Sequence, residues 1–148
     1  MVEKLTKYQK WKRNWSQPDS MDELAYLNFN IHPEDVLIAS NLFLPKFISH
    51  EDSIFWEARF DESSYSNWKQ QFGSDRGKLE RMLNHVHLYD LFDQCQDDVS
   101  DDLFLSLAER MKLCWEMKLK LEFPDRKFIV ELSSGDEDYG PTLVFYQK

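Results

Sequence analysis

The sequence predicts an α+β fold, in which one helix-rich domain carries a small antiparallel sheet of about three strands. Through most of the first 122 residues, apolar side chains recur at steps of three and four, a spacing typical of helices. After Pro124 the pattern changes to two β-rich runs, 127–133 and 142–147, joined by a connector rich in turn residues. We therefore expect a C-terminal β-hairpin, and we expect residues 1–148 to form a single domain.

The composition provides for a hydrophobic core. Of the 148 residues, 42% are hydrophobic and 15% are aromatic, and a chain of this length can bury roughly two-thirds of its extended surface. These values argue against an intrinsically disordered chain. The longest mostly apolar stretch, 36–47, is interrupted by polar residues and is too short to span a bilayer.

The N-terminal segment 1–17 is basic and aromatic. Its apolar residues Tyr8, Trp11 and Trp15 follow a helical spacing, and Pro18 ends the segment. A basic aromatic segment is also typical of nucleic-acid or membrane binding. Because the whole chain carries a net charge of −9, we interpret the segment as a helix that docks on the domain and keeps its lysines in water.

Two helices are predicted to follow. Ser20 and Glu23 form a capping box, which places the first helix at 21–28. Pro33, a residue suited to the first helical position, starts a second helix that continues through 36–44. Since this second helix is apolar nearly all round, we expect it at the centre of the core.

The remaining elements are one strand and three helices. Residues 53–60 alternate between apolar and polar, which predicts a strand beside the C-terminal hairpin. Asp61 and Gly73 bound the next helix, and two more are expected at 75–92 and 100–122. The apolar stripe expected to face the core on the last helix consists of Leu103, Leu107, Met111, Cys114 and Leu121, and it is widened by Phe104, Ala108 and Trp115.

The negative charge is concentrated rather than evenly mixed. Residues 14–62 contain ten acidic residues against Lys46 and Arg59, and residues 88–102 contain six acidic residues and no basic one. Such a field repels nucleic acid and favours a basic protein as partner, although a solvated acidic loop is the alternative reading. Neither acidic cluster has the glycine and glutamate pattern of a calcium loop, so we expect no metal and no cofactor. The candidate partner-binding residues are Asp93, Asp97, Asp98, Asp136, Glu137 and Asp138, with Trp11 and Tyr139 as aromatic anchors.

A second candidate site is the run that contains His85, His87 and Asp90. Two histidines separated by one residue can chelate a metal when the backbone is extended. On the predicted helix 75–92, however, they lie roughly 200° apart around the axis. We therefore predict that the two imidazoles do not share a metal ion and that each bonds a nearby carbonyl or carboxylate instead.

These observations leave two hypotheses from different classes. The first is a non-enzymatic acidic protein-binding module, similar in general build to inhibitors or immunity proteins, that holds a basic partner protein. The alternative is a small enzyme with a catalytic site around His85, His87 and Asp90, since no motif of a known activity occurs elsewhere. The two cysteines, Cys95 and Cys114, suit neither a disulfide scaffold nor a zinc cage, so we expect reduced thiols and a cytoplasmic location.

Overall fold

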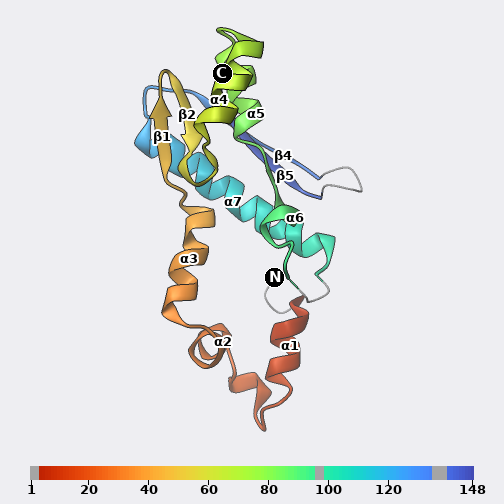
Figure 1. The fold of residues 1–148 in the computed structure, drawn as a ribbon. Helices are drawn as coiled ribbons and strands as arrows, with labels where there is room; N and C mark the ends of the chain where they lie inside the picture. Colours follow the sequence, from red (N-terminus) through yellow and green to blue (C-terminus); the bar gives the residue numbers. More distant parts are fainter. Residues whose placement is uncertain (1–3, 96–98, 135–139) are drawn as a thin grey trace. The chain divides into compact units, whose positions relative to one another are not determined.

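The computed structural model describes residues 4–95, 99–134 and 140–148 and has the predicted α+β architecture (Figure 1). The chain divides into two compact units, residues 1–40 and 41–148. Helix α3 (Pro33–Phe43) crosses the division. Each unit is described by itself below.

The first unit is helical and is organised around aromatic side chains. It contains α1 (Thr6–Lys12), the 3-10 helix η2 (Pro18–Ser20), α2 (Glu23–Asn30) and most of α3. Aromatic rings at centroid separations of 4.8 to 6.3 Å connect α1 with α2. The rings belong to Tyr8, Trp11, Trp15, Tyr26 and Phe29.

The start of α2 differs from the predicted capping box. Asp22 is the N-cap, and its Oδ1 accepts a hydrogen bond of 2.8 Å from Ala25 N. Ser20 instead donates its hydroxyl to Gln17 O within η2. An aspartate satisfies the first free amides of a helix as well as a serine does, so Asp22 takes the place predicted for Ser20 and the helix begins two residues later than expected.

The prediction that the helix after Pro33 lies at the centre of the core is wrong. None of the side chains of α3 is buried, and Val36, Leu37 and Ile38 are exposed. Only Leu42 and Phe43, past the division between the units, are packed against core residues. The apolar composition of a helix indicates that it can be buried, but it does not indicate whether other elements of the fold cover that helix.

Two strands form a separate hairpin at the start of the second unit. β1 (Phe47–His50) pairs antiparallel with β2 (Ser53–Trp56), followed by the 3-10 helix η3 (Glu57–Arg59). The sequence predicted the early strand but placed it in one sheet with the C-terminal hairpin, and that pairing is wrong. All four residues of β2 are buried, so the strand is covered on both faces. The alternation of apolar and polar residues therefore did not indicate which face of the strand is buried.

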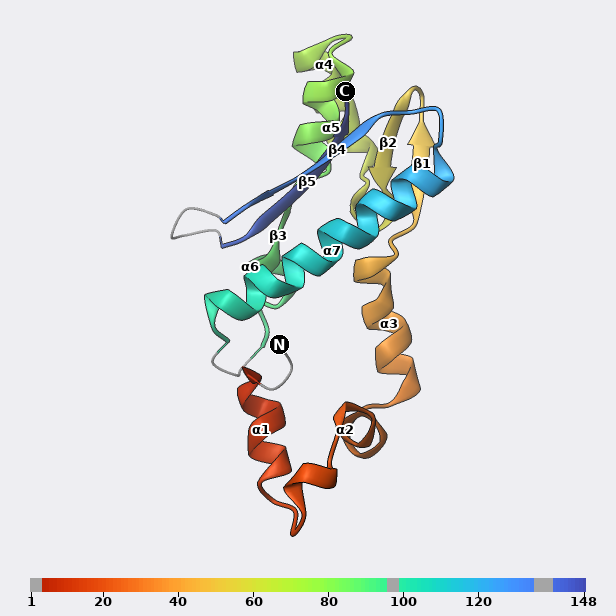
Figure 2. The same ribbon diagram turned by 180° about the vertical axis from the view of Figure 1, so that it is seen from behind.

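The second sheet contains β3 (Val86–His87), β5 (Thr142–Gln147) and β4 (Phe128–Ser133), in that order and antiparallel. Helix α7 (Asp101–Glu122) runs along one face of β4 and β5 (Figure 2). The predicted C-terminal hairpin is thus confirmed. Alternate residues of β4, Phe128, Val130 and Leu132, face the core.

Helix α7 buries the middle of the predicted apolar face, including Ala108, Met111 and Trp115, but not its two ends. Trp115 is fully buried at its centre, and its Nε1 donates a 2.8 Å hydrogen bond to Leu42 O. Leu103 and Leu121, both placed in the predicted stripe, are exposed. The buried residues of α7 are Ala108, Met111, Trp115 and Leu119.

The predicted continuous helix 75–92 is also wrong. After α4 (Glu62–Phe72), which is capped by Asp61 and Gly73 as predicted, the chain forms α5 (Arg76–Leu83), then β3, then α6 (Leu88–Leu91). Tertiary bonds override the helical periodicity here, since Val86 and His87 pair with β5 instead.

Two buried polar side chains join the two sheets: Glu80 of α5 and Asn84, the C-cap residue of that helix. We call this pair the α5 clamp. Glu80 accepts hydrogen bonds from Ile54 N of β2 and Gln147 N of β5. Asn84 Nδ2 donates to Ile54 O at 2.8 Å and to Phe145 O at 3.2 Å. The clamp therefore supplies hydrogen bonds that neither sheet supplies to the other.

Candidate functional site

His87 ends the two-residue strand β3, an outer strand of the three-stranded sheet, and His85 directly precedes that strand. Val86 is buried in the core, so His87 projects from the opposite face of the strand. Their ring centroids are 5.2 Å apart, at an interplanar angle of 69°. The predicted separation of the two rings on opposite flanks of a helix is therefore wrong, because the segment is extended.

A hydrogen bond through Nδ1 orients each ring. His85 Nδ1 lies 2.5 Å from Met82 O, and His87 Nδ1 lies 2.8 Å from Thr142 Oγ1. The predicted role for these imidazoles, bonding a nearby carbonyl, fits His85. Asp90 follows in α6 and is exposed. The structure thus brings the two histidines together, and their Nδ1 bonds go to groups other than Asp90.

The acidic candidates are only partly within the described residues. Asp93 is exposed just after α6. Trp11 is half-buried in the aromatic cluster of the first unit, where its ring lies 5.1 Å from that of Tyr26. The other candidates lie outside the described residues: Asp97, Asp98, Asp136, Glu137, Asp138 and Tyr139.

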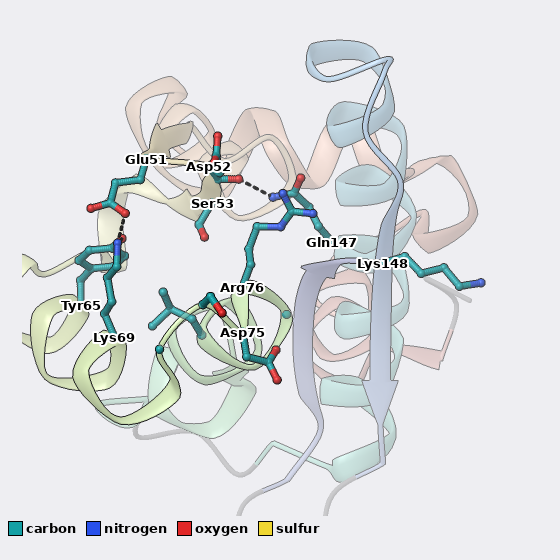
Figure 3. Close-up of a pocket in the computed structure, with 13 residues that line it drawn as sticks. Glu51, Asp52, Ser53, Tyr65, Lys69, Asp75, Arg76, Gln147 and Lys148 are labelled. Atoms are coloured by element: carbon teal, nitrogen blue, oxygen red, sulfur yellow. Dashed lines mark hydrogen bonds and ion pairs between the residues drawn. The ribbon is translucent and has the colours of Figure 1, made fainter.

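A cleft of about 690 Å³ opens between the β1–β2 turn, α4, α5 and the end of β5 (Figure 3). On one side Lys69 of α4 pairs with Glu51, and its Nζ also donates to Tyr65 Oη at 3.2 Å. On the other side Gln147 Nε2 donates to Asp52 O at 3.1 Å. Basic and acidic side chains share the lining, and neither histidine of the pair belongs to it. The cleft therefore has no single-sign field to select a charged ligand.

Three tyrosines have pKa values above the ordinary range. Burial raises the pKa of Tyr65. A hydrogen bond to Glu131 raises the pKa of Tyr146, and one to Asp101 raises the pKa of Tyr89. All three hydroxyls consequently keep their protons at neutral pH, so none of them is poised as a general base; those of Tyr89 and Tyr146 donate to Asp101 and Glu131.

The first unit exposes apolar and acidic side chains on two successive helices. Leu24 of α2 is 72% exposed and Ile38 of α3 is 70% exposed. No lysine or arginine occurs from residue 14 to residue 40. We define the α2–α3 surface by its exposed apolar residues Leu24, Leu27, Phe29, Val36, Leu37 and Ile38 and its exposed acidic residues Asp19, Asp22, Glu23, Glu34 and Asp35.

Sequence reasoning identified the acidic excess of this region but missed its exposed apolar side chains, because it assigned those of the second helix to the core. A signal for it was nevertheless present. Five acidic residues and no basic one occur in 14–40, so the helices have no cation for the mixed ion pairs typical of an ordinary solvated face.

Comparison with protein-family models, with curated proteins and with solved structures finds no match to this chain. Within the described ranges, no helix combines the length and the apolar character needed to cross a membrane. The assignment of a function therefore depends on the residues themselves.

Proposed function

We propose that this chain is a protein-binding module whose α2–α3 surface takes a basic, amphipathic segment of another protein. The observation that carries the proposal is the combination of six exposed apolar side chains with five exposed acidic ones and no base between residues 14 and 40. Clustered exposed apolar side chains mark interaction sites in soluble proteins.

The chemistry of the surface specifies the partner. Leucine, valine, isoleucine and phenylalanine side chains gain free energy when an apolar face covers them, by about 25 cal/mol per Å². The surrounding carboxylates attract lysine and arginine, which raises the association rate and sets the orientation. A segment with one apolar face and one basic face satisfies both requirements, as an amphipathic helix does.

The geometry does not favour the enzyme alternative. The cleft that the second unit contains is lined by residues other than His85, His87 and Asp90. The tyrosines with raised pKa values hold protons rather than release them. A binding role needs no such group, since affinity comes from buried apolar contacts and charge complementarity.

The proposal is tested with a synthetic helical peptide that carries leucine on one face and lysine on the other. We expect calorimetry to show binding to the full chain that weakens with added salt, because salt screens the attraction between charges. A peptide with glutamate in place of lysine is expected not to bind. A pull-down from the native host then identifies the partner, whose binding segment is expected to be basic.

Two double variants locate the binding surface. Leu37→Ser/Ile38→Ser removes two exposed apolar side chains from α3, and we expect the affinity to fall about tenfold or more. Leu113→Ser/Met117→Ser is the matched control, since these residues are equally exposed on α7 but lie among both acidic and basic residues. The proposal fails if both variants weaken binding equally. It also fails if the α3 variant lowers the melting temperature, because its side chains would then belong to a core.

A further inference from the structure

We propose that the cleft of the second unit binds the phosphate group of a small molecule, held by hydrogen-bond donors from β2, α4 and the start of α5. Its volume of about 690 Å³ is within the range of small-molecule sites, about 300–1,000 Å³. The residues that line the cleft all belong to the second unit. The inference therefore does not depend on the proposed binding of a protein partner by the α2–α3 surface.

The Ser53 side chain is the main indication of a ligand. Ser53 is only 4% exposed, and no described residue forms a hydrogen bond with its hydroxyl. In the described chain, every side-chain nitrogen or oxygen that is sealed from solvent has a hydrogen-bond partner. The Ser53 hydroxyl is therefore open to the cleft, and Figure 3 shows it directed into the space between Lys69 and Arg76. A hydroxyl so withdrawn from bulk water gains a partner when a ligand enters.

Tyr65 supplies a second donor in the wall of the cleft. Tyr65 is 3% exposed, and its oxygen accepts a hydrogen bond of 3.2 Å from Lys69 Nζ. No described residue accepts the proton of the Tyr65 hydroxyl. Because burial raises the pKa of Tyr65, the hydroxyl keeps this proton at neutral pH. It can therefore donate to a molecule bound in the cleft.

The start of α5 adds two further donors. Arg76 is exposed, lines the cleft and forms no ion pair with a described residue. The amides on either side of Gly77 are used, since Arg76 N donates to Ser74 O and Lys78 N donates to Asp75 Oδ1. Gly77 N has no acceptor among the described residues. A free amide at a helix N-terminus and a guanidinium both bind phosphate oxygens.

The carboxylates at the rim of the cleft leave these donors available. Glu51 pairs with Lys69, and Asp75 pairs with Lys78 and caps α5. The lining contains three basic and three acidic side chains, so recognition depends on short hydrogen bonds rather than on a long-range field. A phosphate presents oxygens in several directions, whereas a carboxylate presents two in one plane. Phosphate therefore suits donors that come from three different elements.

The α5 clamp fixes two walls of the cleft in advance. Glu80 accepts hydrogen bonds from Ile54 N, next to Ser53, and from Gln147 N on the opposite side. Gln147 Nε2 also donates to Asp52 O, so the turn before β2 is tied to the end of β5. Binding in a preformed site loses little free energy to ordering of the protein.

Titration of the full chain with sodium phosphate, followed by nitrogen–proton NMR at neutral pH and constant ionic strength, tests the proposal. We expect saturable shifts of the Ser53 and Gly77 amide signals, with a dissociation constant on the order of 1 mM. Acetate is expected to bind at least about fivefold more weakly. Shifts that do not saturate below about 20 mM phosphate overturn the proposal, as do shifts confined to the N-terminal lysines. Acetate that binds as tightly as phosphate overturns the choice of ligand.

Two variants with matched controls locate the site. Ser53→Ala is expected to lower phosphate affinity about fivefold or more, with an unchanged or higher melting temperature because the hydroxyl has no partner among the described residues. Arg76→Gln changes an exposed side chain and is expected to lower the affinity by a similar factor. The controls are Ser66→Ala and Arg59→Gln, since both residues are exposed and lie outside the lining of the cleft.

Both controls are expected to bind phosphate as the unchanged protein does. Unchanged affinity in both Ser53→Ala and Arg76→Gln overturns the proposal. A clear fall in the melting temperature of Ser53→Ala also overturns it, because the hydroxyl would then be bonded within the protein and not available to a ligand.

Discussion

Among the described residues 4–40, Tyr8 is the one buried hydrophobic side chain, whereas residues 41–148 bury side chains of α7 and of both sheets around Trp115. The two units do not differ in the supply of apolar residues, since α3 is among the most apolar segments of the chain. They differ in whether other elements cover those residues. Apolar content therefore predicts the capacity for burial, and topology decides whether it is used.

The largest expected effect compares one tryptophan from each unit. Trp115→Ala removes a fully buried indole and its bond to Leu42 O, and we expect the free energy of unfolding to fall by about 3–5 kcal/mol. Trp11→Ala removes a half-buried indole and is expected to cost about 1–2 kcal/mol. Urea denaturation followed by circular dichroism measures both. Equal losses would break the contrast between the units.

The second prediction concerns the α5 clamp, which has no counterpart described in the first unit. Glu80→Ala leaves Ile54 N and Gln147 N without their acceptor, and buried donors without partners cost about 1–3 kcal/mol each. We expect a loss of at least about 3 kcal/mol by urea denaturation. Glu57→Ala, which removes an exposed ion pair with Lys46, is the control and is expected to cost less than about 1 kcal/mol. A Glu80→Ala variant as stable as the control would show that the clamp contributes nothing.

The smallest expected effect concerns two exposed carboxylates of the second unit, Asp61 and Asp75, which we compare with the buried carboxylate of Glu80 in the α5 clamp. A hydrogen bond from Ser64 N lowers the pKa of Asp61, and one from Lys78 N lowers the pKa of Asp75. Their stabilising contribution is present above the unfolded value of 3.8 and is lost as the pH falls through the lower folded pKa. Asp61→Asn/Asp75→Asn keeps both caps but removes this titration.

We therefore expect the free energy of unfolding of the double variant to decline less steeply below pH 3.8 than that of the unchanged protein. Urea denaturation at a series of acidic pH values measures the slope. An identical slope would mean that these caps do not carry the pH dependence.

Local signals predicted what depends on neighbours in sequence. The caps at Asp61 and Gly73 and the C-terminal hairpin were predicted correctly, because turn and cap chemistry acts over a few residues. The break after Leu83 was not predicted, since it depends on bonds from Asn84 to strands about 30 and 61 residues away.

The candidate site was predicted in part for the same reason. The sequence singled out His85 and His87 as residues with ligand chemistry, but the predicted helix placed their rings on opposite flanks, whereas the ring centroids lie 5.2 Å apart. Whether two such residues share a face depends on Val86 pairing with Leu143 of β5. The exposure of the apolar side chains on the α2–α3 surface was not predicted, because it depends on which other elements cover these helices. The sequence shows only the charge imbalance of the region.

The α5 clamp also has a consequence for intermolecular assembly. It bonds Ile54 N and O and Trp56 N on β2, and Phe145 O and Gln147 N on β5. Unpaired main-chain groups of this kind on a strand are a template for adding a strand from another molecule, the first step of β-aggregation. By occupying them with two side chains four residues apart, the chain closes these parts of β2 and β5 to strand addition without the need for a longer sheet.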